Sequence, residues 1–295
     1  MPTTKEDLID MLCDYLMIID DAETLETSWV RSFQPYNISL TIRQLQASLR
    51  MNQPMPTECF NMGVRLLAYN ENKRLTSANV MVSKHYMDLR FSTTYESALK
   101  PQSEKLNVQE LAKSLETWPY MKYDASRCRF VRIFLYDYCE PLFEILIPII
   151  VQLLMPWKRG GLNLFVFDRE EKTLTVLDPT PIPDWCKDMP YKRYVHRIIN
   201  VSKSYRRAMG VDVFAWKHIL PSGIPVIEDR DLNAFILLQY MSAWNNEKIM
   251  PISTDGQRLR KEIVINLLTY DGNSWQCMIS LSVREYLSRI TGIRQ

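Results

Sequence analysis

The chain has few of the residues that build phosphate loops and metal sites. It holds 8 glycines in 295 residues, and neither a Gly-x-Gly-x-x-Gly nor a P-loop pattern occurs. Its 3 histidines, His85, His196 and His218, lack zinc-site spacing, and so do its cysteines. We therefore expect no metal site and no cofactor.

The cysteines are scattered, and a targeting signal is missing. No Cys-x-x-Cys pair occurs. The N-terminal stretch carries Glu6, Asp7 and Asp10 and lacks the basic flank and apolar core of a secretory signal; its acidity argues against a mitochondrial presequence. We expect free, mostly buried thiols and a cytoplasmic or nuclear protein. The 6 cysteines are Cys13, Cys59, Cys128, Cys139, Cys186 and Cys277.

Strong net charge and long apolar runs are absent too. The formal net charge is +2, which gives no electrostatic reason to expect nucleic acid or a membrane as the main partner. The longest apolar run, residues 145–157, is interrupted by Pro148, Gln152 and Pro156 and is too short to span a bilayer. We expect this run to form a buried strand.

The order of apolar patterns predicts an α+β fold. Helical spacing dominates the first hundred residues, as at Ile42, Leu45 and Leu49, whereas strand patterns begin near residue 130. We expect a helical N-terminal region over 1–107 and a second domain over 108–295, or one continuous globular unit. The predicted helices cover 1–16, 40–51, 57–69, 108–116, 190–209, a segment from Asn233, and 255–270. The predicted strands cover 130–136, 145–155, 162–167 and 173–177, with a turn at 169–172 and a loop at 91–107.

Four segments of the chain resemble a known family. GLNLFVFDREEKTLTVLD (161–178), GIPVIEDRDLNAFILLQYMSAW (223–244) and DGQRLRKEIVINLLTYDG (255–272) resemble the catalytic half of SUMO-protease-type cysteine proteases. More narrowly, they resemble diverged, transposon-associated copies of this domain in grasses. SWVRSFQPYNISLTIRQLQASLRMNQPMPTECFNMGVRLL (28–67) resembles the helical N-terminal part of the same plant group. The resemblance covers most of residues 28–270. It implies a papain-like cysteine protease fold in which a helical part precedes a mixed sheet flanked by helices.

Such proteases need four catalytic groups. A Cys at the N-terminus of a central helix attacks the substrate, and the helix dipole and a nearby imidazolium favour its thiolate. A His on a strand takes the thiol proton, an Asp on the adjacent strand orients the His, and a Gln before the Cys stabilises the oxyanion.

The resemblance shows that only one of these groups remains. Gly161 stands at the His position and Leu162 at the Trp that follows it, while Asp178 occupies the Asp position. Ile227 replaces the oxyanion Gln, and Asn233 replaces the nucleophilic Cys. An Asp alone supplies neither nucleophile nor base, so the resemblance implies a degenerate catalytic site.

A shifted alignment does not restore the site. No cysteine lies between Cys186 and Cys277, and no histidine lies between His85 and His196. The remaining positions have plain structural explanations: Asn233 or Asp231 as a helix cap, and Asp178 as a strand exit bonded to local N–H groups.

A few side chains are candidates for binding. Trp157, Trp185, Trp216 and Leu162 could line the old substrate channel, although aromatic residues are more often core. A basic stretch could be a solvated helix face, a surface for an acidic protein, or a nucleic-acid contact; the low net charge favours a protein. Its cations are Lys187, Lys192, Arg193, Arg197, Lys203, Arg206 and Arg207.

Two functional classes follow. In the first, the chain is an inactive protease-like protein that works as a binding or regulatory module: an antagonist, a scaffold or a modifier binder. Because Leu162 replaces an aromatic clamp, we expect modifier binding to be weak and another protein to be the partner. In the second, a displaced Cys and His form an active protease or deSUMOylase. A relic without a selected role is a third possibility.

Overall fold

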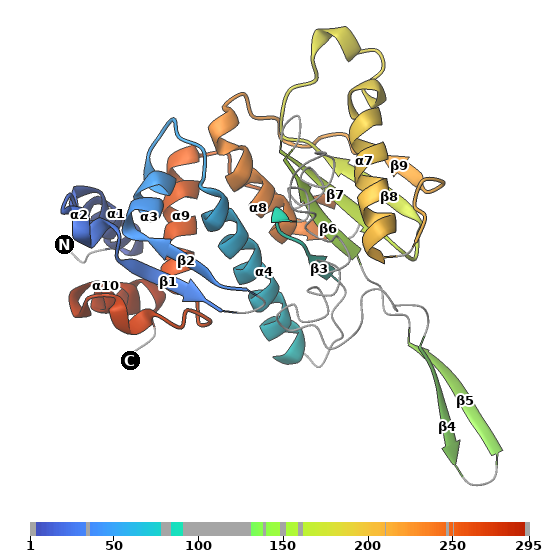
Figure 1. The fold of residues 1–295 in the computed structure, drawn as a ribbon, viewed down its shortest axis with the longest axis horizontal. Coiled ribbons are helices and arrows are strands. Elements are labelled where there is room, and N and C mark those ends of the chain that lie inside the picture. Colours follow the sequence, from blue (N-terminus) through green and yellow to red (C-terminus); the bar gives the residue numbers. More distant parts are fainter. Residues whose placement is uncertain are drawn as a thin grey trace, which may run out of the picture.

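The computed structural model describes residues 4–33, 36–77, 84–90, 131–137, 140–147, 152–158, 162–209, 211–245, 248–249 and 251–292. Its architecture is α+β, as the sequence predicts (Figure 1). The helices are α1 (Lys5–Ile18), α2 (Ala22–Leu25), α3 (Ile42–Leu49), α4 (Thr57–Ser77), α7 (Tyr191–Met209), α8 (Asn233–Ala243), α9 (Gly256–Leu268) and α10 (Leu281–Thr291), with 3-10 helices η1 (Asp184–Cys186), η2 (Arg230–Leu232) and η3 (Gln276–Met278). The strands are β1 (Ser28–Ser32), β2 (Ile38–Thr41), β3 (Lys84–Tyr86), β4 (Val131–Asp137), β5 (Glu140–Ile147), β6 (Gln152–Trp157), β7 (Asn163–Asp168), β8 (Thr173–Leu177), β9 (Lys217–Ile219), β10 (Trp244–Asn245) and β11 (Lys248–Ile249).

A five-stranded mixed sheet carries the predicted hairpin. Its order is β3-β6-β7-β8-β9; the inner pairs β6–β7 and β7–β8 are antiparallel, and the outer pairs β3–β6 and β8–β9 are parallel. Asp168 holds the turn between β7 and β8, because its Oδ1 accepts from the N–H groups of Glu170 and Glu171 at 3.0 and 2.9 Å. The predicted turn is therefore confirmed.

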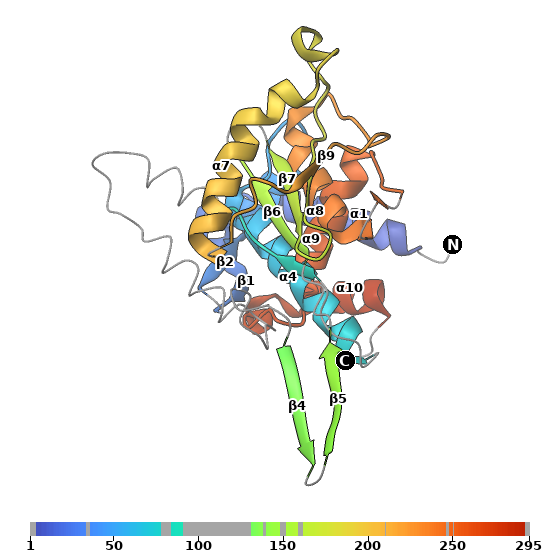
Figure 2. The same ribbon diagram turned by 90° about the vertical axis from the view of Figure 1, so that its right-hand side faces the viewer.

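Both faces of β7 are covered, which explains why all six of its residues are buried. On one face, the Phe167 ring stacks on Tyr205 of α7 with ring centroids 4.3 Å apart. On the other face, Asp168 accepts from Gln152 of β6, and Gln152 in turn accepts from the indole of Trp244 after α8. The helices α7 and α8 thus pack on opposite faces of the sheet (Figure 2).

The N-terminal elements contact the C-terminal helices. Helix α1 contacts α3, α9 and α10, and β3 adds to the edge of the sheet beside β6. Gln46 of α3 donates to the main-chain oxygens of Leu16 and Ile19 at 2.8 and 2.7 Å, which joins α3 to the end of α1. A division at residues 107 and 108 stays a prediction.

The helix predictions hold where the structure describes them, with shifts at the ends. The helix predicted over 40–51 is shorter, because Leu40 lies on β2 and Thr41 forms a capping box with Gln44. The helix predicted over 57–69 continues to Ser77. The predicted loop at 91–107 and helix at 108–116 lie outside the described residues.

The single strand predicted over 145–157 is wrong. Its first part belongs to β5, which pairs with β4, and its second part is β6 in the central sheet. Apolar content cannot reveal such a division, because both strands are apolar. The sequence patterns also missed β1, β2, β3 and α10.

Within the described ranges, none of the helices combines the length and the apolar character needed to cross a membrane.

Candidate functional site

Three of the positions compared with the resembling family, Leu162, Asp178 and Ile227, lie where β7 begins and β8 ends. Leu164 pairs with Leu177, so the antiparallel register brings Leu162 and Asn163 beside Asp178. The lead-in to α8 reaches the same place, because the Ile227 N–H donates to the Pro179 carbonyl at 2.7 Å. Gly161, which the resemblance places at the His position, lies outside the described residues.

Asp178 is the centre of a dense polar cluster. Its Oδ1 accepts from the main-chain N–H and the hydroxyl of Thr180 at 2.9 and 2.6 Å. Its Oδ2 accepts from the Tyr194 hydroxyl at 3.1 Å and forms ion pairs with Arg193 Nη2 at 3.3 Å and Arg197 Nη1 at 3.5 Å. The local N–H bond expected for Asp178 is confirmed, but three partners from α7 join it.

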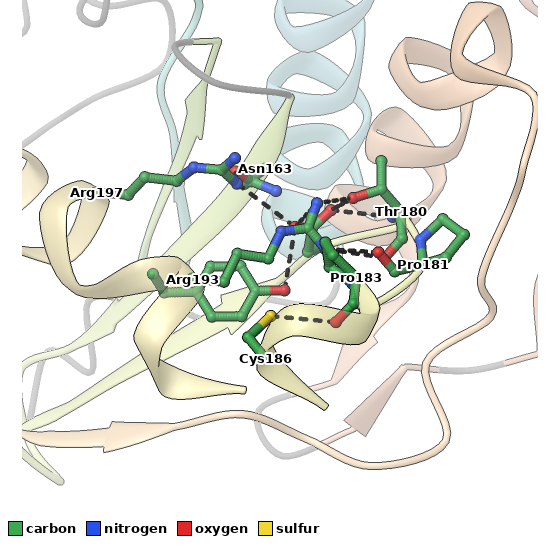
Figure 3. Close-up of polar contacts among 9 residues, drawn as sticks. Asn163, Thr180, Pro181, Pro183, Cys186, Arg193 and Arg197 are labelled. Carbon is green, nitrogen blue, oxygen red and sulfur yellow. Dashed lines mark hydrogen bonds and ion pairs between the residues drawn. The ribbon is translucent and has the colours of Figure 1, made fainter. Parts of the chain in front are cut away.

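The two arginines of the cluster point inward. Their side chains are 12% and 14% exposed, and that of Asp178 is 3% exposed. Arg193 also donates to the Pro181 carbonyl at 2.8 Å and to Thr180, and Arg197 donates to the side-chain oxygen of Asn163 (Figure 3). Burial lowers the pKa of Arg197, while burial and the Asp178 charge raise the pKa of Tyr194.

Because the Arg193 and Arg197 side chains point inward, the interpretation of the basic stretch as one solvated helix face is wrong for these two residues. Helical geometry places residues 193, 194 and 197 on one side of α7, toward the sheet. Lys192 and Lys203 remain exposed, and Arg206 is bound to Asp212 at the surface. The side chain of Arg207 lies outside the described ones.

Asn233, which the resemblance places at the nucleophile position, is the first residue of α8. The residue is 6% exposed, and its Oδ1 has no hydrogen-bond partner among the described residues. It does not cap the helix, and neither does Asp231, so that expectation is wrong. The cap comes earlier: Asp229 accepts from the Asp231 N–H at the start of η2, which leads directly into α8.

Ile227, which the resemblance places at the oxyanion position, has no side-chain donor. It is 8% exposed and packs in the core. A side chain of α8 also holds the lead-in, because the Tyr240 hydroxyl donates to the Pro225 carbonyl at 2.7 Å. The side chains at these two positions, 227 and 233, are therefore an aliphatic group and an amide.

The remaining thiols and imidazoles lie in separate places. Cys59 and Cys186 donate to main-chain carbonyls, and burial raises the pKa of Cys59 to about 12. Cys277 lies exposed in η3. His218 lies on β9, where burial lowers its pKa.

The side chains expected to line a substrate channel lie in different environments. Trp216 is 8% exposed, with its ring centroid 6.0 Å from that of Tyr205, so it is a core residue. Trp185, on η1, is 63% exposed. Leu162 is partly buried against the core. Trp157 ends β6, and its side chain lies outside the described ones.

Two surface grooves lie elsewhere. One of about 520 Å³ lies between α1, α9 and the end of α10, and one of about 140 Å³ lies between α9 and α10. Neither is lined by Asp178, Ile227 or Asn233. In the described part of the chain, no three His, Cys, Asp or Glu side chains cluster to hold a metal ion.

Comparison with solved structures decides the fold. The chain has the fold of a Ulp1-like SUMO protease. SUMO protease Ulp1 with its catalytic cysteine oxidised to a sulfenic acid superposes with a TM-score of 0.55 at 13% identity, covering 91% of this chain and 96% of that chain. The C-terminal Ulp1 protease domain in complex with Smt3, the yeast ortholog of SUMO, gives 0.53 at 11% identity and covers 92% and 98%. The Chaetomium thermophilum Ulp1-like SUMO protease catalytic domain gives 0.53 at 9% identity and covers 96% and 95%.

Sequence comparison adds nothing to this. No protein-family model matches the chain, and no curated protein matches it. The predicted fold is thus confirmed by structural similarity alone.

Proposed function

We propose that this chain is a catalytically inactive protein with a SUMO-protease fold, and that it acts as a protein-binding or regulatory module. The observation that carries the proposal is the set of hydrogen bonds and ion pairs made by the Asp178 carboxylate. A carboxylate has about four lone-pair positions. Here Thr180, Tyr194, Arg193 and Arg197 use both oxygens, so no acceptor position is left to orient an imidazole.

The helix end supports the same proposal. A helix N-terminus stabilises a thiolate, but the first side chain of α8 is the amide of Asn233. A carboxamide cannot replace a cysteine thiolate as nucleophile. Ile227 has no donor to offer an oxyanion. The alternative, an active protease with a displaced Cys and His, requires a thiol within hydrogen-bond reach of an imidazole. The described thiol hydrogen bonds of Cys59 and Cys186 end at main-chain oxygens instead.

A labelling experiment tests the inactive state. The purified chain is incubated with SUMO and ubiquitin vinyl sulfones, with an active Ulp1-like protease as positive control. We expect no covalent adduct. The exposed Cys277 could react nonspecifically, so a Cys277→Ser variant and a heat-denatured modifier probe run in parallel. An adduct that requires the folded modifier overturns the proposal.

The proposed partner is a protein other than a modifier. One similar structure holds Smt3, which keeps a ubiquitin-like modifier as a candidate. However, Leu162 at the clamp position offers less stacking surface for a Gly-Gly tail than Trp. We propose that modifier binding is weak, and a pull-down by the whole chain beside a modifier panel tests it. Saturable binding to SUMO or ubiquitin would contradict this part, and a partner that outcompetes the panel would support it.

A further inference from the structure

Arg31 on β1 carries a positive charge that no carboxylate of the described residues neutralises through an ion pair. It is the only charged residue in 28–42, and 272–283, the segment that packs beside it, has none. The two acids that flank these segments already have partners. Glu26 pairs with Arg43 at 2.6 Å, and Asp271 pairs with Lys73 at 2.8 Å. The charge of Arg31 is therefore available to a ligand.

Two aromatic rings hold the guanidinium group of Arg31 in place. Its Cζ lies 4.7 Å from the ring centroid of Phe33 and 4.7 Å from that of Trp275. Phe33 follows Arg31 at the two-residue spacing of one strand face, whereas Trp275 comes from the turn before η3. The Nε of Arg31 donates to the side-chain oxygen of Asn37 at 3.2 Å, which fixes the plane of the group.

The turn that carries Trp275 is fastened to β1 by Asn273, which is 5% exposed. The Oδ1 of Asn273 accepts from the N–H groups of Arg31 and Trp275 at 2.9 and 3.0 Å. Its Nδ2 donates to the Trp29 carbonyl at 2.9 Å. Ser274 donates its N–H and its hydroxyl to the Arg31 carbonyl, both at 2.9 Å. The stack around Arg31 is thus preorganised, which lowers the entropy cost of binding a ligand.

The outer nitrogens of Arg31 keep their donors for a ligand. Nη1 and Nη2 have no hydrogen-bond partner among the described residues, and neither is a buried unpaired atom, so both reach solvent. Two parallel N–H groups of a guanidinium match the two oxygens of a carboxylate. The same surface exposes Phe33 by 50% and Met278, on η3 in contact with β1, by 47%. Arginine, aromatic residues and methionine are enriched in protein interfaces.

We propose that Arg31, stacked between Phe33 and Trp275, binds an Asp or Glu side chain in an apolar segment of a partner protein. This inference rests on the protein-binding function proposed above and gives it a surface. A single cation matches a single carboxylate, whereas nucleic acid is bound by several cations that neutralise several phosphates. The surface lies at the other end of the molecule from β7 and β8, so it is separate from the Asp178 cluster (Figure 1).

A peptide selection on the whole folded chain supplies a defined ligand. Random dodecapeptides displayed on phage are selected on the wild-type chain. We expect the selected peptides to share one Asp or Glu next to aromatic or aliphatic residues. The most enriched peptide is then synthesised with an acetylated N-terminus and an amidated C-terminus, and so is a form in which the corresponding amide replaces the acid. Calorimetric titration measures the binding of both forms.

Arg31→Gln should weaken binding of the acidic peptide by about tenfold or more, because a charge-assisted hydrogen bond is lost. Arg31→Lys keeps the charge but not the planar donors or the stacking, so it should weaken binding nearly as much. The matched control is Arg74→Gln, which removes a 67% exposed arginine paired with Glu71 and should bind like the wild type. The amide form of the peptide should bind the wild type as weakly as the acidic form binds Arg31→Gln. Circular dichroism checks that the variants stay folded.

Four results would overturn the proposal: selection of no peptide or of peptides without an acid, equal binding by the wild type and Arg31→Gln, full binding by Arg31→Lys, or equal binding of the acidic and amide peptides. Peptides that bind regardless of Arg31 would leave the chain a protein-binding module, so the function proposed above would survive while this site would not. A vinyl sulfone adduct would overturn the inactive state without changing these titrations.

Discussion

Buried arginines are held differently on the two sides of this molecule. In the helical part, Arg65 and Arg260 are each 1% exposed, and they donate to main-chain carbonyls: Arg65 to Ser32 and Tyr36, Arg260 to Ser48. Beside the sheet, Arg193 and Arg197 form ion pairs with the carboxylate of Asp178.

The two kinds of arginine contact have different roles: one holds the scaffold together, and the other lies at the candidate site. Arginines that end on carbonyls fasten chain segments together and need no acid. Arginines that end on Asp178 bind the carboxylate at the position of the family's catalytic Asp in the resemblance, and these ion pairs anchor α7. Four predictions test this contrast, from the largest expected effect to the smallest.

Removing the Asp178 charge should have the largest effect. Asp178→Asn leaves two nearly buried guanidinium groups without a counter-charge, and breaking a buried pair in this way costs about 3–5 kcal/mol. Urea denaturation measures the free energy of unfolding. The control is Asp184→Asn, whose 89% exposed carboxylate pairs with Lys187 at the surface and should contribute about 0–1 kcal/mol. Equal losses in the two variants would contradict the anchoring role.

Replacing Arg65 should cost about 2–3 kcal/mol. Arg65→Met keeps the apolar packing but removes two donors, one to Ser32 at 3.0 Å and one to Tyr36 at 2.9 Å, so two carbonyls lose their partner. Thermal and urea denaturation measure the loss. A loss as large as that of Asp178→Asn would show that carbonyl anchoring and ion pairing are equivalent here.

The stability of the chain should depend on pH, because burial of His85 disfavours its charged form. His85 on β3 is 2% exposed, and burial lowers its pKa to about 4. The unfolded chain, with the ordinary pKa near 6.5, binds the proton first, so stability falls as pH drops from about 6.5 to 4. At about pH 5 the loss should reach about 2 kcal/mol. In His85→Gln this part of the pH dependence should vanish, whereas the exposed His196→Gln should keep it.

Replacing Arg260 should have the smallest effect. Arg260 makes one hydrogen bond, to the Ser48 carbonyl at 3.2 Å, and its guanidinium carbon lies 4.7 Å from the Phe235 ring centroid. Burial lowers the pKa of Arg260, the charges of Asp229 and Asp231 oppose this shift, and its Nε and Nη2 have no hydrogen-bond partner among the described residues. Arg260→Met therefore removes unsatisfied donors together with one bond and should change the free energy of unfolding by less than about 1 kcal/mol. A loss equal to that of Arg65→Met would show that the number of carbonyl contacts does not matter.

The residues of the Asp178 cluster have a regular spacing in the sequence, but this spacing alone does not show that they meet. Arg193, Tyr194 and Arg197 have the spacing of one helix side, and Asp178 ends a predicted strand. The same spacing fits a solvated basic face. The choice depends on which side of α7 packs against the sheet, and that is a contact between elements.

The sequence by itself determined the local elements and the residue types at the compared positions. Periodicity located the β7–β8 hairpin and the helices α7, α8 and α9. Ile227 has no amide that could stabilise an oxyanion, and Asn233 has no thiol. Only the tertiary structure decided how distant elements meet. It placed β3 in parallel beside β6, divided residues 145–157 between two sheets, and turned two arginines onto Asp178. The physical reason is that hydrophobic periodicity is a property of neighbouring residues, whereas strand partners and buried ion pairs join residues far apart in the chain.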